Sequence, residues 1–82
     1  MSKLTKSEDE SFNDYSSNLT ANIKRLRLQK GFAQERLAYE SKVDRTLISK
    51  IERGAANPTL GVLCKVSYAL GVQISDLLNP PA

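Results

Sequence analysis

The chain has 82 residues and a net charge of +3, from twelve Lys or Arg and nine Asp or Glu, with no His. This length fits one domain with one core, and the single cysteine, Cys64, excludes an intramolecular disulfide bond. No apolar run reaches the length of a membrane span, and the polar N-terminus differs from a signal peptide, so we expect a cytoplasmic protein.

The composition also argues against catalysis, because the chain offers no His, one Cys, no telling pair of carboxylates and no glycine-rich phosphate loop. We therefore expect no enzymatic activity, no cofactor, no metal and no small-molecule ligand. The positive charge lies in residues 15–82, where ten basic side chains outnumber five acidic ones. A basic domain of this kind suits a polyanionic partner.

Residues 1–14 contain two large apolar side chains, Leu4 and Phe12, among Ser, Thr, Lys, Glu and Asp. Such a segment buries too little apolar surface to offset the entropy of ordering it. We predict a flexible tail over residues 1–14, with Phe12 in contact with the domain, and a folded domain over residues 15–82. A partner-binding arm is the alternative.

The first predicted helix starts between Tyr15 and Asn18 and ends at Lys30, followed by Gly31. Its inward face is formed by Leu19, Ile23, Leu26 and Arg27. A buried guanidinium needs a carboxylate partner, and Glu52 is the candidate. Alternatively, the Arg27 side chain extends along the surface to solvent.

Two short helices with a polar turn between them are predicted at Gln34–Glu40 and at Arg45–Arg53, so the segment has the pattern of a helix-turn-helix. The inward side of the motif comprises Leu37, Ala38, Ser41, Val43, Leu47, Ile48 and Ile51. Asp44 is placed as the N-cap of the second helix, and Gly54 closes it. The opposite side of the second helix is polar, with Arg45, Thr46, Ser49 and Lys50.

These polar side chains suit contacts with DNA. Arg45 can donate two hydrogen bonds to guanine, and Thr46 can offer its hydroxyl to a base edge or its methyl to thymine. Lys50, Arg53 and Lys42 suit phosphate groups. The alternative is an ordinary solvated helix face.

The remaining elements are a helix at Leu60–Leu70, capped by Thr59 and ended by Gly71, and a short helix capped by Ser75. The inward face of the longer helix is predicted from Leu60, Leu63, Val66, Ser67 and Leu70. Cys64 lies beside this face as a small core or interface residue. The chain end carries more apolar side chains than its own packing needs, so we expect a dimer surface formed by Val72, Ile74, Leu77 and Leu78.

From Ile23 to Leu78 the chain resembles the Cro/cI-type (XRE) helix-turn-helix regulators of bacteria and phages. The resemblance covers roughly two thirds of the chain and rests on several motifs in the right order. These are Ile23-Lys24-Arg25-Leu26-Arg27, Gly31-Phe32-Ala33-Gln34-Glu35-Arg36-Leu37-Ala38, Ile48-Ser49-Lys50-Ile51-Glu52-Arg53-Gly54, Asn57-Pro58-Thr59-Leu60 and Ala69-Leu70-Gly71-Val72 with Asp76-Leu77-Leu78.

The resemblance implies an all-α, five-helix, lambda-repressor-like domain that binds double-stranded DNA as a homodimer on a palindromic operator. It implies a third helix in the major groove, with Arg45, Thr46, Ser49 and Lys50 at the bases. Gln34 would contact phosphate or a base edge, and Arg27 with Glu52 would form the internal ion pair of the family. Ala33 departs from the Thr common at that position, which costs about 1 kcal/mol of helix capping.

A narrower likeness points to the dimeric controller proteins of restriction–modification systems. It rests on Leu37-Ala38-Tyr39-Glu40-Ser41, Val43-Asp44-Arg45-Thr46 and Ile48-Ser49, although Leu47 stands where those proteins often have an aromatic residue. A general repressor of the same fold remains an equal alternative, and an antitoxin or a protein-interaction module is the rival class. An activator would also contact RNA polymerase, for which Glu35 is a candidate, and we expect a bacterial or phage protein associated with the nucleoid.

Overall fold

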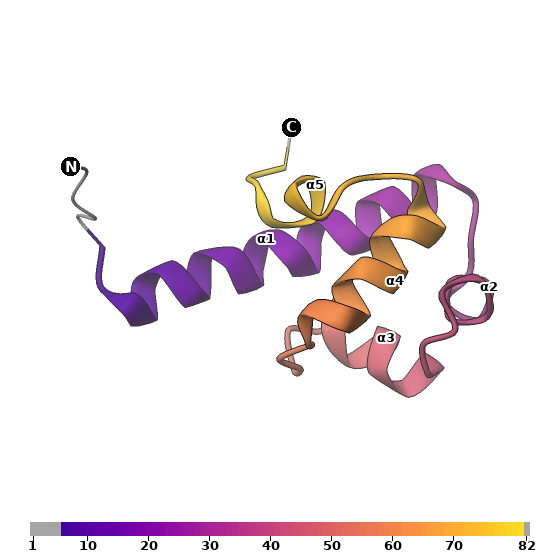
Figure 1. Ribbon diagram of the computed structural model, residues 1–82, viewed down its shortest axis with the longest axis horizontal. Coiled ribbons are helices and arrows are strands. Elements are labelled where there is room, and N and C mark those ends of the chain that lie inside the picture. Colours follow the sequence, from indigo (N-terminus) through magenta and orange to yellow (C-terminus); the bar gives the residue numbers. More distant parts are fainter. Residues whose placement is uncertain (1–5, 82) are drawn as a thin grey trace.

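The computed structural model describes residues 6–81, which form five helices and no strand. The helices are α1 (Glu8–Gln29), α2 (Gln34–Ser41), α3 (Arg45–Glu52), α4 (Leu60–Leu70) and α5 (Ile74–Leu78). The other four helices gather around the C-terminal half of α1 (Figure 1). α3 and α5 pack on α1, and α2 packs on both α3 and α4. The predicted all-α fold with five helices is confirmed.

The first helix begins at Glu8, so the predicted start near Tyr15 is wrong, and residues 8–14 are helical rather than a flexible tail. A capping box explains the early start. The Ser7 hydroxyl accepts from the Glu10 N–H at 3.1 Å, and the Glu10 carboxylate accepts from the Ser7 N–H at 2.9 Å. These bonds lower the pKa of Glu10. Residues 1–5 of the predicted tail, with Leu4, lie outside the described residues.

The core is built from the inward faces of all five helices and from the turn between α2 and α3. Its buried apolar residues are Leu19, Ile23, Leu37, Val43, Ile48, Ile51, Leu63, Val66, Leu70 and Leu77. Leu26 packs at the margin of this core. Leu60 is 69% exposed, so its predicted inward position is wrong. Cys64, which the sequence places beside this face, is also exposed.

The ends of the later helices follow local hydrogen-bonding rules. The Thr59 hydroxyl accepts from the Val62 N–H at 3.2 Å, as the sequence predicts for this cap. Gly71 ends α4 with φ of 72°, a left-handed conformation that favours glycine. α5 begins at Ile74 with Gln73 at the N-cap, so the predicted Ser75 cap is wrong. The Asp76 carboxylate accepts from the Gln73 N–H instead.

Two asparagines that the sequence does not single out attach α5 to α1. The Asn22 side-chain amide donates to the carbonyls of Leu77 at 2.9 Å and Asn79 at 2.7 Å. One helical turn earlier, the Asn18 amide donates to the Leu78 carbonyl at 2.9 Å. The last carbonyls of a helix lack partners within that helix, so these amides stabilise the C-terminal end of α5.

We expect Asn22→Ala to lower the free energy of unfolding by about 2 kcal/mol, because it leaves two carbonyls of the α5 end without their buried donor. Urea unfolding followed by circular dichroism measures the change. Gln29→Ala, at an exposed position on the same helix, is the control. An equal effect of the two substitutions would contradict the role of Asn22.

Candidate nucleic-acid interface

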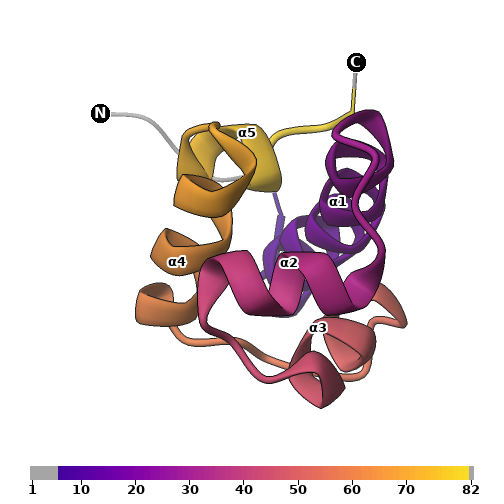
Figure 2. The same ribbon diagram turned by 90° about the vertical axis from the view of Figure 1, so that its right-hand side faces the viewer.

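α2 and α3 form the predicted helix-turn-helix, in which α2 lies across the fold beside α3 (Figure 2). The turn depends on Lys42, which adopts a left-handed conformation with φ of 58° and ends α2. Val43 follows, donates its N–H to the Ala38 carbonyl at 3.1 Å and buries its side chain in the core. The left-handed conformation of Lys42 and the buried Val43 side chain thus both contribute to the angle between the two helices.

The amphipathic pattern of α3 decides which of its side chains reach the outside. Ile48 and Ile51 are buried, which turns the predicted DNA-binding side of the helix to solvent. Arg45, Thr46 and Lys50 are exposed, and Ser49 is half-buried. Asp44 occupies the N-cap position, but within residues 6–81 its side chain accepts no capping hydrogen bond, contrary to the prediction.

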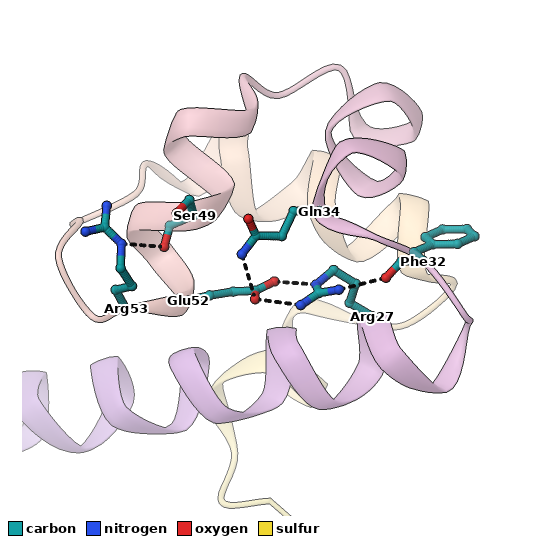
Figure 3. Close-up of polar contacts among 6 residues, drawn as sticks. All are labelled: Arg27, Phe32, Gln34, Ser49, Glu52 and Arg53. Carbon is teal, nitrogen blue, oxygen red and sulfur yellow. Dashed lines mark hydrogen bonds and ion pairs between the residues drawn. The ribbon is translucent and has the colours of Figure 1, made fainter.

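A buried ion pair attaches this motif to α1, as Figure 3 shows. The Arg27 guanidinium donates to both Glu52 carboxylate oxygens, at 2.7 and 2.9 Å, and its third bond goes to the Phe32 carbonyl at 2.7 Å. The two side chains are 9% and 4% exposed. The solvent-directed alternative for Arg27 is therefore wrong.

The ion pair changes the pKa of Arg27. Hydrogen bonding to Glu52 raises the pKa of Arg27 above its ordinary value, despite the opposing effect of burial. A raised pKa keeps the guanidinium protonated until the solution is strongly alkaline, so Arg27 stays charged over the whole neutral range. The ion pair connects α1, the start of α2 through Phe32, and the end of α3, and so holds the two helices of the motif at a constant orientation.

Of the three residues predicted to contact phosphate, Gln34 joins this pair, whereas Arg53 and Lys42 are exposed. The Gln34 amide donates to the Glu52 carboxylate at 3.2 Å, which makes it a member of the buried network as well as the first residue of α2. Arg53 is exposed at the C-cap of α3, and its Nε donates to the Ser49 carbonyl at 3.3 Å (Figure 3). Lys42 is exposed in the turn.

An ion pair between Arg45 and Glu35 also bears on the interface. The Arg45 Nε lies 3.1 Å from the Glu35 carboxylate, and both side chains are more than half exposed. From the sequence, Glu35 was a candidate polymerase contact or, more ordinarily, an exposed side chain paired with a neighbour such as Arg36, whereas its partner in the structure is Arg45. The pairing could not be found from sequence spacing, because it depends on the angle between α2 and α3.

The N-terminus of α2 lacks a polar cap because Ala33 occupies the N-cap position in an extended conformation, with φ of −72° and ψ of 166°. We expect Ala33→Ser to raise the free energy of unfolding by about 1 kcal/mol, since a hydroxyl there can accept from a free N–H of the first turn. Thermal unfolding measures the gain, with Ala21→Ser, at an exposed position within α1, as the control. No gain at Ala33 would show that the first turn is already satisfied by solvent.

Comparison with known proteins shows which family has this helix-turn-helix. A family model described as Helix-turn-helix matches residues 23–77, which include the ion pair and all of the motif. The chain belongs to this family. The predicted resemblance to XRE-type regulators is therefore confirmed.

Three relatives refine the comparison. The control protein C.BamHI of Bacillus amyloliquefaciens is 48% identical over 58 residues, covering 70% of this chain and 72% of that protein. The structure of the hypothetical transcription factor NHTF from Neisseria matches with a TM-score of 0.80 and 39% identity, over 84% of this chain and 78% of its own. The controller protein C.AhdI from Aeromonas hydrophila gives a TM-score of 0.71 and 33% identity, over 73% and 91%.

This helix-turn-helix protein is a DNA-binding transcriptional regulator and not an enzyme. Within residues 6–81 no cluster of His, Cys, Asp or Glu could hold a metal ion. None of the described helices is long and apolar enough to cross a bilayer.

The predicted dimer residues divide into two groups. Leu77 is fully buried within the single chain, so it belongs to the core and its assignment to a dimer surface is wrong. Val72, Ile74 and Leu78 are half-buried at the edge of the core. Their outer faces remain open to a partner.

Proposed function

We propose that the protein binds a palindromic operator as a homodimer, with α3 of each copy in the major groove. Successive half-sites then lie about one helical turn apart, roughly 34 Å. The observation that carries the proposal is the exposed polar side of α3, held by the buried Arg27–Glu52 pair. A rigid support of this kind lets a few side chains meet base edges in a reproducible register.

Within this proposal the side chains have different tasks. Arg45, Thr46, Ser49 and Lys50 contact bases, and Arg45 contributes most to sequence choice because its guanidinium can bind guanine in a bidentate manner. Lys42 and Arg53 flank α3 and bind phosphate. Gln34 adds a phosphate contact at the start of α2, where free backbone N–H groups also favour an anion.

The kind of regulator is also part of the proposal. The likeness to C.BamHI and C.AhdI supports a restriction–modification controller that acts on its own gene. Transcription would then respond to the concentration of the protein, through its dimerisation and its occupancy of the operator. An antitoxin-type or protein-interaction module is the alternative, and a co-purifying protein partner would favour it.

Selection of binding sites from a random duplex library tests the proposal. We expect an inverted repeat whose half-sites are one helical turn apart, and we expect it upstream of the gene for this protein. Repeating the selection at two salt concentrations separates base contacts from phosphate contacts, because phosphate binding weakens strongly with salt. Binding without an enriched sequence, lost uniformly as salt rises, would contradict the proposed operator recognition.

The Glu35–Arg45 pair allows a more specific test of α3. We expect Glu35→Gln to strengthen operator binding by roughly two- to fivefold, since Arg45 no longer has to leave an exposed ion pair worth less than about 1 kcal/mol. Glu40→Gln is the matched control, because it removes the same charge from the Arg36 pair on α2. Fluorescence anisotropy measures both. Weaker binding of Glu35→Gln would mean that Glu35 orients Arg45 toward its base.

A further inference from the structure

The first turns of α1, Glu8–Tyr15, project beyond the body of the fold, and we name them the α1 extension. α1 has 22 residues, which gives a length of about 33 Å. The molecule is 41 Å long but only 22 by 19 Å across. In Figure 1 the extension, in indigo, lies to the left of the other helices.

One face of the α1 extension is apolar. Phe12 and Tyr15 lie at helical spacing from Leu19 and Ile23, so the four residues form one continuous stripe. Leu19 and Ile23 are buried in the core, whereas Phe12 and Tyr15 are 49% and 54% exposed. The apolar stripe of α1 therefore extends beyond the part that the other helices bury.

The exposed end of the stripe opens onto a groove. Phe12 and Tyr15 line it together with Pro58, Leu63 and Leu78, and its volume is about 100 Å³. Leu78 belongs to the proposed dimer surface. The groove is thus continuous with the surface through which two copies are proposed to associate.

Charge favours a basic partner for the extension. Residues 6–14 carry four acidic side chains and only Lys6 as a base, a net charge of −3, whereas residues 15–82 carry +5. Two extensions placed against each other would repel. An extension placed against the body of a second copy would be attracted to it.

We infer that the α1 extension docks on a second copy of this chain, with Phe12 and Tyr15 packed against Pro58, Leu63 and Leu78, which form the body side of the groove of that copy. A two-fold axis satisfies both copies at once, because each offers the same extension and the same groove. The inference rests on the proposed homodimer and assigns part of its interface. The extension lies outside residues 23–77, so the contact involves residues that the family model does not match.

Sedimentation equilibrium of the full chain without DNA tests the inference. We expect the double variant Phe12→Ser/Tyr15→Ser to raise the dimer dissociation constant at least about tenfold, because buried aromatic residues often dominate an interface. Leu28→Ser is the matched control, since Leu28 is 58% exposed on the same helix but outside the groove. We expect the control to leave the dissociation constant unchanged.

Helicity by circular dichroism shows whether the α1 extension is still folded in the double variant. If the double variant loses helix, the dimer dissociation constant of the single variant Phe12→Ser is measured instead. A wild-type dimer whose dissociation constant is unchanged by these variants would overturn this inference alone. An equal effect of Leu28→Ser would overturn it too. A wild-type chain that stays monomeric with and without operator would overturn the proposed homodimer as well.

Discussion

Arg27→Ala is expected to lower the free energy of unfolding by about 3–5 kcal/mol, the range found when one partner of a buried ion pair is removed. The Glu52 carboxylate would stay buried without its bidentate partner, and the Phe32 carbonyl would lose its donor. Since small domains are stable by only about 5–15 kcal/mol, this change is a large part of the total. Urea unfolding of the variant and the wild type measures it.

Two further variants show whether the loss of unfolding free energy comes from the unpaired charge of Glu52. Arg36→Ala breaks the exposed pair with Glu40 and should cost less than about 1 kcal/mol. Arg27→Met combined with Glu52→Leu removes both charges and should be less destabilising than Arg27→Ala alone. If Arg27→Ala cost no more than Arg36→Ala, the buried pair would contribute little to holding α3.

Arg45→Ala is expected to remove discrimination at one or two base pairs of each half-site, by on the order of 1–3 kcal/mol. In the proposed homodimer both copies carry the change, so binding to the intact operator should fall by more than binding to an isolated half-site. Competition between the selected operator and variants with single base changes measures the loss by anisotropy. Unfolding of the variant should stay close to wild type, because Arg45 is exposed.

Lys24→Ala is the control, because it removes the same charge from an exposed position on α1. We expect it to weaken binding slightly and without regard to sequence. If Arg45→Ala weakened binding equally on every sequence, Arg45 would be a phosphate contact. Sequence choice would then have to come from Thr46, Ser49 and Lys50.

The periodicity of the sequence predicted the helices of the body well, because buried positions in a helix recur every three or four residues. Ile48 and Ile51 gave the orientation of α3 directly. The same rule failed for Leu60, whose spacing fits the inward face although it lies at the first turn, where the body no longer covers it. Whether a position at the end of a stripe is buried depends on how far the neighbouring helices extend.

The start of α1 was missed for a related reason. Low apolar content predicted a tail, but the Ser7 capping box and the acidic first turn stabilise a helix through local interactions. The signal was present in the sequence as Ser7 followed by Glu10. A helix end stabilised by its own caps needs little buried apolar surface, so low apolar content does not exclude it.

The sequence by itself determined the family, the five helices of the body and the polar side of α3. It also indicated Glu52 as the candidate partner of Arg27. Each of these depends on which residue types occur and on how far apart they lie along the chain. The tertiary structure alone decided which distant groups meet. It brought Glu35 to Arg45, Asn22 to the end of α5, and Leu77 into the core rather than onto the surface. Such contacts depend on the angles at which helices pack, and a linear pattern does not contain those angles.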